Sequence, residues 1–445
     1  LKGAGKTPFS RYHDGRAVLR SSIREYLASE AMQALRVPTA RVLSLVGSSS
    51  VATRPWYSDK QTTRQHAPDT IITEQCAMTC RAAPSFLRVG HLELFSRRAK
   101  RGVPGGIEGL ERLCRHALKR EFDEVDATLP LCSQLVCAAR IFARRQAHTV
   151  AQWLRVGYIQ GNMNSDNCLL SGRTMDYGTC CPRPQLFVHT AEAAPRWPGP
   201  FGFLERYDPV WNPFISDTER KYGFERQPSA AQANLMTLIE ALVPLMELAP
   251  DASSKLAELR QVGQEEFESF LTSELSQMRQ AKLGLLTWDE GAEQLWSDLC
   301  KLMEESAADY TIVFRELSTL SEGELSSAAS LVRGKCSRTE AYCKLRRAFY
   351  HGDELHADQQ QGWERWLAAY ARRLLAEGRP HDERRREMAR SSPKYVPREW
   401  MLARAYKAAQ ADDYSVVHEM ARLFEKPYDE QPEFEAEYYR CAGLV

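Results

Sequence analysis

A change of pattern near residue 105 constrains the fold of this 445-residue chain more than any other feature. Before it, short apolar stretches typical of strands surround one helical segment. After it, apolar residues recur at helical spacing over long stretches. The breaker Gly102-Val-Pro-Gly-Gly106 separates the two patterns and is expected to be a hinge between lobes. The sequence predicts an α+β fold with a small mixed lobe, residues 1–105, and a large helical lobe, residues 106–445.

The N-terminal lobe is predicted to contain short strands and one helix. The expected strands are Arg16–Arg20, Val42–Val46, Met78–Ala83 and Leu87–Phe95. The helix is expected to begin near Ser22, because Ser22 and Glu25 fit a capping box, and to end before Pro38. The polar, basic stretch from Gly47 to Pro68 lacks periodicity and is expected to be a surface insertion.

The C-terminal lobe is predicted to be mostly helical. The expected helices are Glu108–Phe122, Cys132–Arg155, Ala230–Met246, Ser253–Arg279, Ala292–Ser306, Glu340–Phe349, Trp363–Ala376, Met401–Ala409 and Ser415–Phe424. One long segment, Gly157 to Pro213, has no period and is rich in Gly, Asn, Asp, Pro and aromatic residues. Loops of that composition on a helical scaffold usually carry function.

Composition excludes several classes of protein. The apolar fraction of 43% and charged fraction of 26% exclude a collagenous or wholly disordered chain. The net charge of +1 gives no argument for a nucleic-acid partner. No membrane span is expected, because the best apolar run, Ala241–Leu248, is short and interrupted by Pro244. The 12 cysteines form no CxxC motif, so reduced thiols are expected rather than a zinc site.

The aperiodic segment contains the strongest candidate for chemistry. It holds Gly161-Asn-Met-Asn-Ser-Asp-Asn167, followed by Met175-Asp-Tyr-Gly178. Oxygen ligands from Asn167 and Asp176 could hold Mg²⁺ against nucleotide phosphates, which would leave Asp166 to accept a proton. Turns rich in Asn and Asp also occur for purely structural reasons, so both interpretations stay open.

Charged residues of the N-terminal lobe suggest phosphate contacts. A strand lysine paired with a helix glutamate holds nucleotide phosphates in some ATP-using transferases, and Lys2 and Glu25 could form such a pair. The capping box and a frayed chain end explain the same two residues without any function. Arg81 and Arg88 are spaced to grip phosphate oxygens, although arginines also flank strands for structural reasons.

A competing nucleotide motif lies close to the first residue. Gly5-Lys6-Thr7 matches the end of a Walker A loop, which requires a helix to begin at once so that its amides cradle phosphate. Pro8 and the turn His13-Asp-Gly15 oppose such a helix. The sequence therefore disfavours a P-loop.

Together these blocks resemble the selenoprotein O, or YdiU, family of kinase-fold protein adenylyltransferases over nearly the whole chain. The matching blocks are Leu1–Tyr26, Val37–Leu45, Arg81–His91, Gly161–Asn167, Asp176–Gly178, Gly199–Pro209, Ser392–Arg398 and Pro427–Pro432. The resemblance implies a bilobal protein-kinase-like fold that binds ATP in an inverted orientation. It also implies transfer of AMP to Ser, Thr or Tyr hydroxyls of protein substrates, with Mg²⁺ as cofactor and diphosphate as the leaving group.

The resemblance also implies a role for individual residues. It implies that Asp166 is the proton acceptor and that Asn167 and Asp176 are the Mg²⁺ ligands. The nucleotide contacts that it implies are Lys2, Asp14, Gly15, Glu25, Arg81 and Arg88. A catalytically inactive pseudokinase that binds a nucleotide or a partner is the first alternative, and ordinary phosphotransfer is the second.

The chain departs from the family pattern in several places. The family's usual His before the loop glycine is Gln160 here, which is expected to weaken support for the catalytic loop. Residues 179–198 separate two blocks that are nearly contiguous in the family. Cys441 is the one thiol left of a C-terminal redox pair, so redox control through that pair is not expected. Because the chain starts at Leu1, before which the family has a glycine-rich loop, we expect a truncated N-terminus. A mitochondrial location is implied by the family alone.

Overall fold

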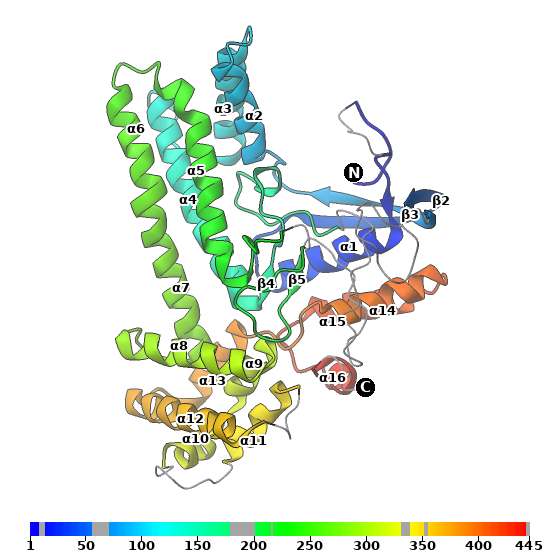
Figure 1. The fold of residues 1–445 in the computed structure, drawn as a ribbon, viewed down its shortest axis with the longest axis vertical. Helices are drawn as coiled ribbons and strands as arrows, with labels where there is room; N and C mark the ends of the chain where they lie inside the picture. Colours follow the sequence, from blue (N-terminus) through cyan, green and yellow to red (C-terminus); the bar gives the residue numbers. More distant parts are fainter. Residues whose placement is uncertain are drawn as a thin grey trace.

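A computed structural model of the chain describes residues 1–8, 14–55, 71–178, 201–214, 217–330, 339–350 and 355–441. Helices dominate, and the principal sheet is small and lies near the N-terminus (Figure 1). The predicted α+β class is therefore confirmed. In the described part of the chain, no helix combines the length and the apolar character that crossing a membrane would require.

The N-terminal sheet is antiparallel, with strand order β1-β3-β2. Its strands are β1 (Ala17–Val18), β2 (Arg41–Pro55) and β3 (Ile71–Ala82). Lys2 extends the sheet beside β1, because its N–H donates to the Thr79 carbonyl at 2.8 Å and its carbonyl accepts from the Thr79 N–H at 3.1 Å. The strands predicted from the sequence near residues 42–46 and 78–83 are confirmed. β2 also includes residues 47–55 of the expected insertion, whereas residues 56–70 lie outside the described part.

Helix α1 (Leu19–Ala34) follows β1 directly and packs against the sheet. Ile23, Leu27 and Met32 lie on its buried face. The predicted capping box is wrong, because the residue before the first turn is Val18 and Ser22 lies inside the helix. The Ser22 hydroxyl is buried without a hydrogen-bond partner among the described residues, so Glu25 has no capping role.

The strand predicted at Leu87–Phe95 is also wrong. This segment begins α2 (Val89–Lys100), and its apolar residues Val89, Leu92 and Phe95 recur at three-residue intervals, the spacing of a helix face. The face packs against α3 (Gly106–Glu121) and α5 (Gln227–Met246). The breaker at residues 102–106 therefore joins two helices, and the lobe boundary at residue 105 stays a prediction.

The helices predicted beyond residue 106 are confirmed with two differences. A π-helical turn at Val262–Glu266 splits one of them, and the helix expected at Glu340–Phe349 ends at Leu345, before a 3-10 turn at Arg346–Ala348. The remaining helices are α4 (Leu131–Val156), α6 (Ala252–Gln261), α7 (Phe267–Leu283), α8 (Glu290–Glu305), α9 (Tyr310–Thr319), α10 (Glu322–Ala329), α11 (Glu340–Leu345), α12 (Ala357–Glu377), α13 (His381–Ser391), α14 (Glu399–Gln410), α15 (Ser415–Glu425) and α16 (Pro432–Tyr438). Of these, α9, α10, α13 and α16 were not predicted. α13 is almost wholly polar and so lacks an apolar stripe, whereas α9 is only ten residues long.

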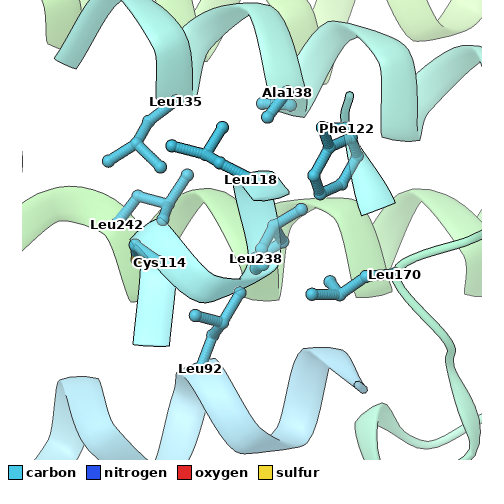
Figure 2. Close-up of a pocket in the computed structure, with 11 residues that line it drawn as sticks. Leu92, Cys114, Leu118, Phe122, Leu135, Ala138, Leu170, Leu238 and Leu242 are labelled. Atoms are coloured by element: carbon cyan, nitrogen blue, oxygen red, sulfur yellow. The ribbon is translucent and has the colours of Figure 1, made fainter. Parts of the chain in front are cut away.

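Long helices α4, α5 and α7 lie side by side and form a scaffold for the aperiodic segment (Figure 1). Leucines from α2, α4 and α5 and Phe122 after α3 surround a small apolar cavity of about 20 Å³ (Figure 2). α4 ends at Gly157, whose φ of 72° is the left-handed conformation that glycine adopts without strain. The chain then enters β4 (Tyr158–Ile159), which pairs with β5 (Gly202–Phe203).

The C-terminal helices α14 and α15 pack on α1 (Figure 1). Arg24 of α1 is buried; its guanidinium pairs with Glu399 of α14 and donates to the Phe201 carbonyl at 2.5 Å. Because Arg24 precedes Glu25, this contact connects the C-terminal region to the helix that carries a predicted site residue.

Candidate functional site

Lys2, Arg81 and Glu25 converge because of the sheet register. Lys2 pairs with Thr79, and Arg81 lies two residues further along β3, so both side chains share one face of the sheet. α1 packs on that face and brings Glu25, which is 1% exposed, between them. Lys2 Nζ lies 2.5 Å from Glu25 Oε2, and Arg81 Nη1 lies 3.2 Å from Glu25 Oε1. The ion pair anticipated from the sequence is present.

Asp176 completes this group from the aperiodic segment. Lys2 Nζ donates to Asp176 Oδ1 at 2.7 Å, and Arg81 Nη1 lies 3.9 Å from the same oxygen. Asp176 has a φ of +68°, a left-handed conformation that costs energy for a residue other than glycine. Such strained residues persist where the surroundings hold them in place, and here two cations do so.

Electrostatics keep this group charged. Burial lowers the pKa of Lys2, but the carboxylates of Asp176 and Glu25 outweigh burial, and the pKa lies above its ordinary value. Burial raises the pKa of Asp176, but Lys2, Arg81 and Arg88 outweigh it and the pKa is lowered. Burial and the nearby Arg81 lower the pKa of Arg88. The three cations exceed the two carboxylates, so the group has a net positive charge, which suits a polyanionic ligand.

Gly178 has no side chain, and the Lys2–Glu25 contact occupies the space that a side chain there would need. A Cβ at Gly178 would lie 2.5 Å from Lys2 Nζ and 2.9 Å from Glu25 Oε2. Both distances are far below van der Waals contact, so a side chain here would displace the ion pair. The glycine that ends the Asp-Tyr-Gly motif therefore lets the ends of the Lys2 and Glu25 side chains meet beside it.

Arg88 connects this group to Asp166. Arg88 precedes the first turn of α2, and its Nη1 donates to the Asp166 carbonyl at 2.7 Å. Asp166 lies in the short 3-10 turn Ser165–Asn167, with its carboxylate over the start of α2. A Cβ at Gly90 would lie 2.4 Å from Asp166 Oδ1, so glycine permits this approach. The positive end of α2 favours the charged carboxylate there.

Asn167 and Asp176 offer oxygen ligands of the kind that Mg²⁺ prefers. Asn167 Nδ2 donates to the Asn162 carbonyl at 3.2 Å, which commits the amide nitrogen and leaves the side-chain oxygen to accept or ligate. Within the described residues, no group of three or more His, Cys, Asp or Glu side chains is arranged to hold a metal. The donor set fits Mg²⁺ that takes its other ligands from phosphates and water.

Asp14 and Gly15 lie in the turn before β1. Asp14 Oδ1 accepts from the Arg16 N–H at 2.9 Å, and the Gly15 carbonyl accepts from the Gly5 N–H at 3.1 Å. Their role as nucleotide contacts stays a prediction. Gly5 pairs with this turn, and the next described helix begins at Leu19, an arrangement unlike a P-loop.

Sequence reasoning missed the residues that support the loop carrying Asp166 and Asn167. Gln160 is buried; its Nε2 donates to the Met175 carbonyl at 2.9 Å, and its N–H donates to Gln227 Oε1 at 2.9 Å. Asn234 Nδ2 donates to the Met163 carbonyl at 2.7 Å. Gln160 therefore supports the loop, contrary to the expectation from the family resemblance that this residue would weaken it. Gln227 and Asn234, two polar residues in the mostly apolar α5, were the available signal.

Comparisons with known proteins agree with this geometry. The family described as "Protein adenylyltransferase SelO" matches residues 1–185 and 198–425. Proteins named "Protein nucleotidyltransferase YdiU" are similar to the chain: that of Flavobacterium johnsoniae is 34% identical over 98% of this chain, and that of Xanthomonas axonopodis pv. citri is 37% identical over 97%. In both cases the match covers 72% of the relative's length. The unmatched residues 186–197 fall inside the stretch set apart by the sequence, which lies outside the described residues.

Proposed function

The chain belongs to the SelO family of protein adenylyltransferases, and we propose that the cluster of Lys2, Glu25, Arg81, Arg88 and Asp176 binds the ATP from which it transfers AMP to protein. The observation that carries this proposal is the meeting of Lys2 with both Glu25 and Asp176. A polyphosphate chain is the ligand class that best suits three cations gathered around two carboxylates.

Each cation of the cluster has a distinct part in the proposal. Glu25 is almost fully buried and orients Lys2, whose ammonium contacts phosphate as a point charge. The forked guanidinium groups of Arg81 and Arg88 hold the phosphates of an inverted ATP, so that the α-phosphorus faces the acceptor hydroxyl. Asp14 and Gly15 contact the nucleotide from the neighbouring turn.

Asn167 and Asp176 would hold Mg²⁺. When bound, the ion would neutralise charge on the phosphate oxygens and stabilise the departing diphosphate. The residues of the chain carry out the other tasks: Lys2 and Arg81 fix the carboxylate of Asp176, and Gln160 fixes the backbone just before it. Residues held in this way need little rearrangement during the reaction.

In the proposed reaction, a Ser, Thr or Tyr hydroxyl oxygen attacks the α-phosphorus of ATP. The bond from that phosphorus to the oxygen bridging the α- and β-phosphates breaks, and diphosphate leaves with the electron pair. Asp166 accepts the hydroxyl proton and later releases it to water. The products are AMP-protein, diphosphate and a proton.

Isotope placement tests the reaction. Protein incubated with Mg²⁺ and ATP labelled with ³²P at the α-position is expected to carry label on a protein acceptor, whereas γ-labelled ATP leaves no label. Asp166→Asn preserves the size of the side chain but lacks the basic carboxylate, and is expected to lose α-labelling. Label from the γ-position alone would indicate phosphotransfer, and label from neither would indicate an inactive pseudokinase. Either result would overturn the proposal.

Two broader expectations accompany this function. Family membership supports a bilobal protein-kinase-like arrangement, with the division near residue 105, and an experimental structure with bound nucleotide would test it. Mitochondrial location is carried over from the family resemblance only, and imaging of the tagged natural gene product in its own cells would test it.

A further inference from the structure

A polar cavity lies apart from the cluster of Lys2, Glu25, Arg81, Arg88 and Asp176, which we call the Lys2 cluster. It has a volume of about 470 Å³ and is open to solvent, between the C-terminal end of α1, the middle of α4 and residues 171–173. The side chains that give it its character are Arg36, Arg145, Arg173, His148, Thr39 and Ser171, and we call it the arginine pocket. Among its described lining residues there is no Asp or Glu, and none belongs to the Lys2 cluster.

Hydrogen bonds join the segments that form the walls of the arginine pocket. The Pro38 carbonyl accepts from both the N–H and the hydroxyl of Thr174, each at 2.8 Å. Thr149 of α4 donates to the Gly172 carbonyl at 2.8 Å. These bonds are buried or half-buried, so the pocket is formed before any ligand arrives. A preformed site loses little conformational entropy on binding.

Two of the pocket's guanidinium groups have no carboxylate partner among the residues that the structure describes. Arg173 is exposed, and its guanidinium makes neither a hydrogen bond nor an ion pair within the described residues. Arg36 is also exposed, and its guanidinium lies 5.6 Å from the ring centre of Tyr428; no ion pair is found for it in the described parts of the chain. The pocket thus presents two cations that a ligand could neutralise.

The other two basic residues are partly neutralised. Arg145 Nη1 donates to the Glu121 carbonyl at 2.6 Å, and its Nη2 lies 2.7 Å from Glu124 Oε1. His148 Nδ1 lies 3.0 Å from Glu274 Oε2. These contacts hold both side chains in place at the cavity, and the two carboxylates do not cancel the charge of Arg36 and Arg173.

We propose that the arginine pocket binds a diphosphate group. Guanidinium forks recognise phosphate oxygens with paired hydrogen bonds, and a group with several negative charges suits several arginines at once. A cavity of about 470 Å³ is of the size that small ligands occupy. Two sources supply this chemistry: free diphosphate, which AMP transfer releases, and the phosphate chain of a nucleotide such as ADP.

The walls connect the arginine pocket to the cluster. Helix α1 carries Glu25, and Arg36 follows the end of this helix. Arg173 lies in the segment that leads to Asp176. The Thr39 hydroxyl lies 2.6 Å from that of Tyr177, the residue after Asp176. A ligand held between Arg36 and Arg173 therefore contacts both segments that position the cluster.

Calorimetric titration of the full chain with inorganic diphosphate, without Mg²⁺, tests the proposal. We expect two binding events, one at the cluster and one at the arginine pocket. The double variant Arg36→Asn/Arg173→Gln is expected to retain only the first, and asparagine tolerates the φ of 61° at position 36. Arg173→Gln alone is expected to weaken the second event about tenfold or more, in line with a lost charge-assisted hydrogen bond. Arg112→Gln, at an exposed position of α3, is the matched control and should leave both events unchanged.

Parallel titrations distinguish the sources of the ligand. Stronger pocket binding of diphosphate than of ADP would identify the free product, and the reverse would identify a nucleotide; either supports the proposal. A single event in the wild type, or identical titrations for wild type and double variant, would overturn it. A third result would also overturn the proposal: a glutamate-rich peptide binds the wild type but not the double variant, and diphosphate does not bind at the pocket. Arg81→Ala alters only the cluster. A change in the binding event that the double variant retains would therefore assign that event to the cluster.

Discussion

Lys2 and Asp176 are 174 positions apart in the sequence, yet Lys2 Nζ donates to Asp176 Oδ1 at 2.7 Å. The same ammonium lies 2.5 Å from Glu25 Oε2, so one lysine connects the edge of the sheet, α1 and the loop that carries Asp176. Two carboxylates share it, and Arg81 lies within 4 Å of both. Removing one partner should therefore disturb the others.

Asp176→Asn should abolish AMP transfer while preserving the fold. Asparagine keeps the shape of the side chain and tolerates the φ of +68°, but it removes the charge that pairs with Lys2 and that would ligate Mg²⁺. We expect α-label transfer to fall by at least about 100-fold, with an unchanged circular dichroism spectrum. Asp412→Asn is a matched control, because exposed Asp412 has a φ of 58°. Full activity of Asp176→Asn would contradict the assignment.

The stability lost in Asp176→Asn should depend on pH in a defined direction. Because the pKa of Asp176 is lowered from 3.8, its contribution is present above that value and disappears as pH falls through the folded-state pKa. The pKa of Lys2 is raised from 10.5, so its contribution is complete below that value and disappears only at still higher pH. Urea unfolding should give a constant difference of about 1–3 kcal/mol between pH 5 and 9. The difference should shrink below pH 3.8, and one that grows there would contradict this interpretation.

Much of the helical part could be predicted from the sequence, because each segment from Glu108 onward with a clear apolar period forms a helix. Where a local pattern had two explanations, tertiary contacts determined which of them was correct. Ser22 and Glu25 have capping-box spacing, but the helix begins earlier, at Leu19, and Glu25 pairs with Lys2 and Arg81 from the sheet. These partners come from distant segments, so no local pattern contains that information.

The candidate site could likewise be predicted only in part from local sequence patterns. Residue types and spacing in the motifs made Asp166, Asn167 and Asp176 candidates, and their roles stay predictions. Motifs could not show that Gly178 borders the lysine ammonium or that Gln160 holds the Met175 carbonyl. Both depend on distances between segments, which the packing of α1 and α5 determines.

Gly178→Ala should impair nucleotide binding more than folding. The added Cβ would lie 2.5 Å from Lys2 Nζ and 2.9 Å from Glu25 Oε2, so the ion pair must move apart. We expect a weakening of ATP binding of about tenfold or more, equivalent to the loss of about one charge-assisted contact, measured by calorimetry. Gly323→Ala is the control, because a Cβ there meets no atom within 4 Å. Equal ATP affinity of Gly178→Ala and wild type would refute the packing argument.

The buried pair of Arg24 and Glu399 should stabilise the position of α1. Arg24 is almost fully buried, and the pKa of Glu399 is raised because burial outweighs the attraction of Arg24. Glu399→Gln leaves the guanidinium without its carboxylate, and we expect a loss of about 3–5 kcal/mol in the free energy of unfolding. The double variant Arg24→Met/Glu399→Leu buries no charge and should recover most of that loss. Urea unfolding of wild type, Arg24→Met, Glu399→Leu and the double variant gives the coupling energy. Additive single effects would mean that the pair contributes nothing, and α14 would then not position the helix that carries Glu25.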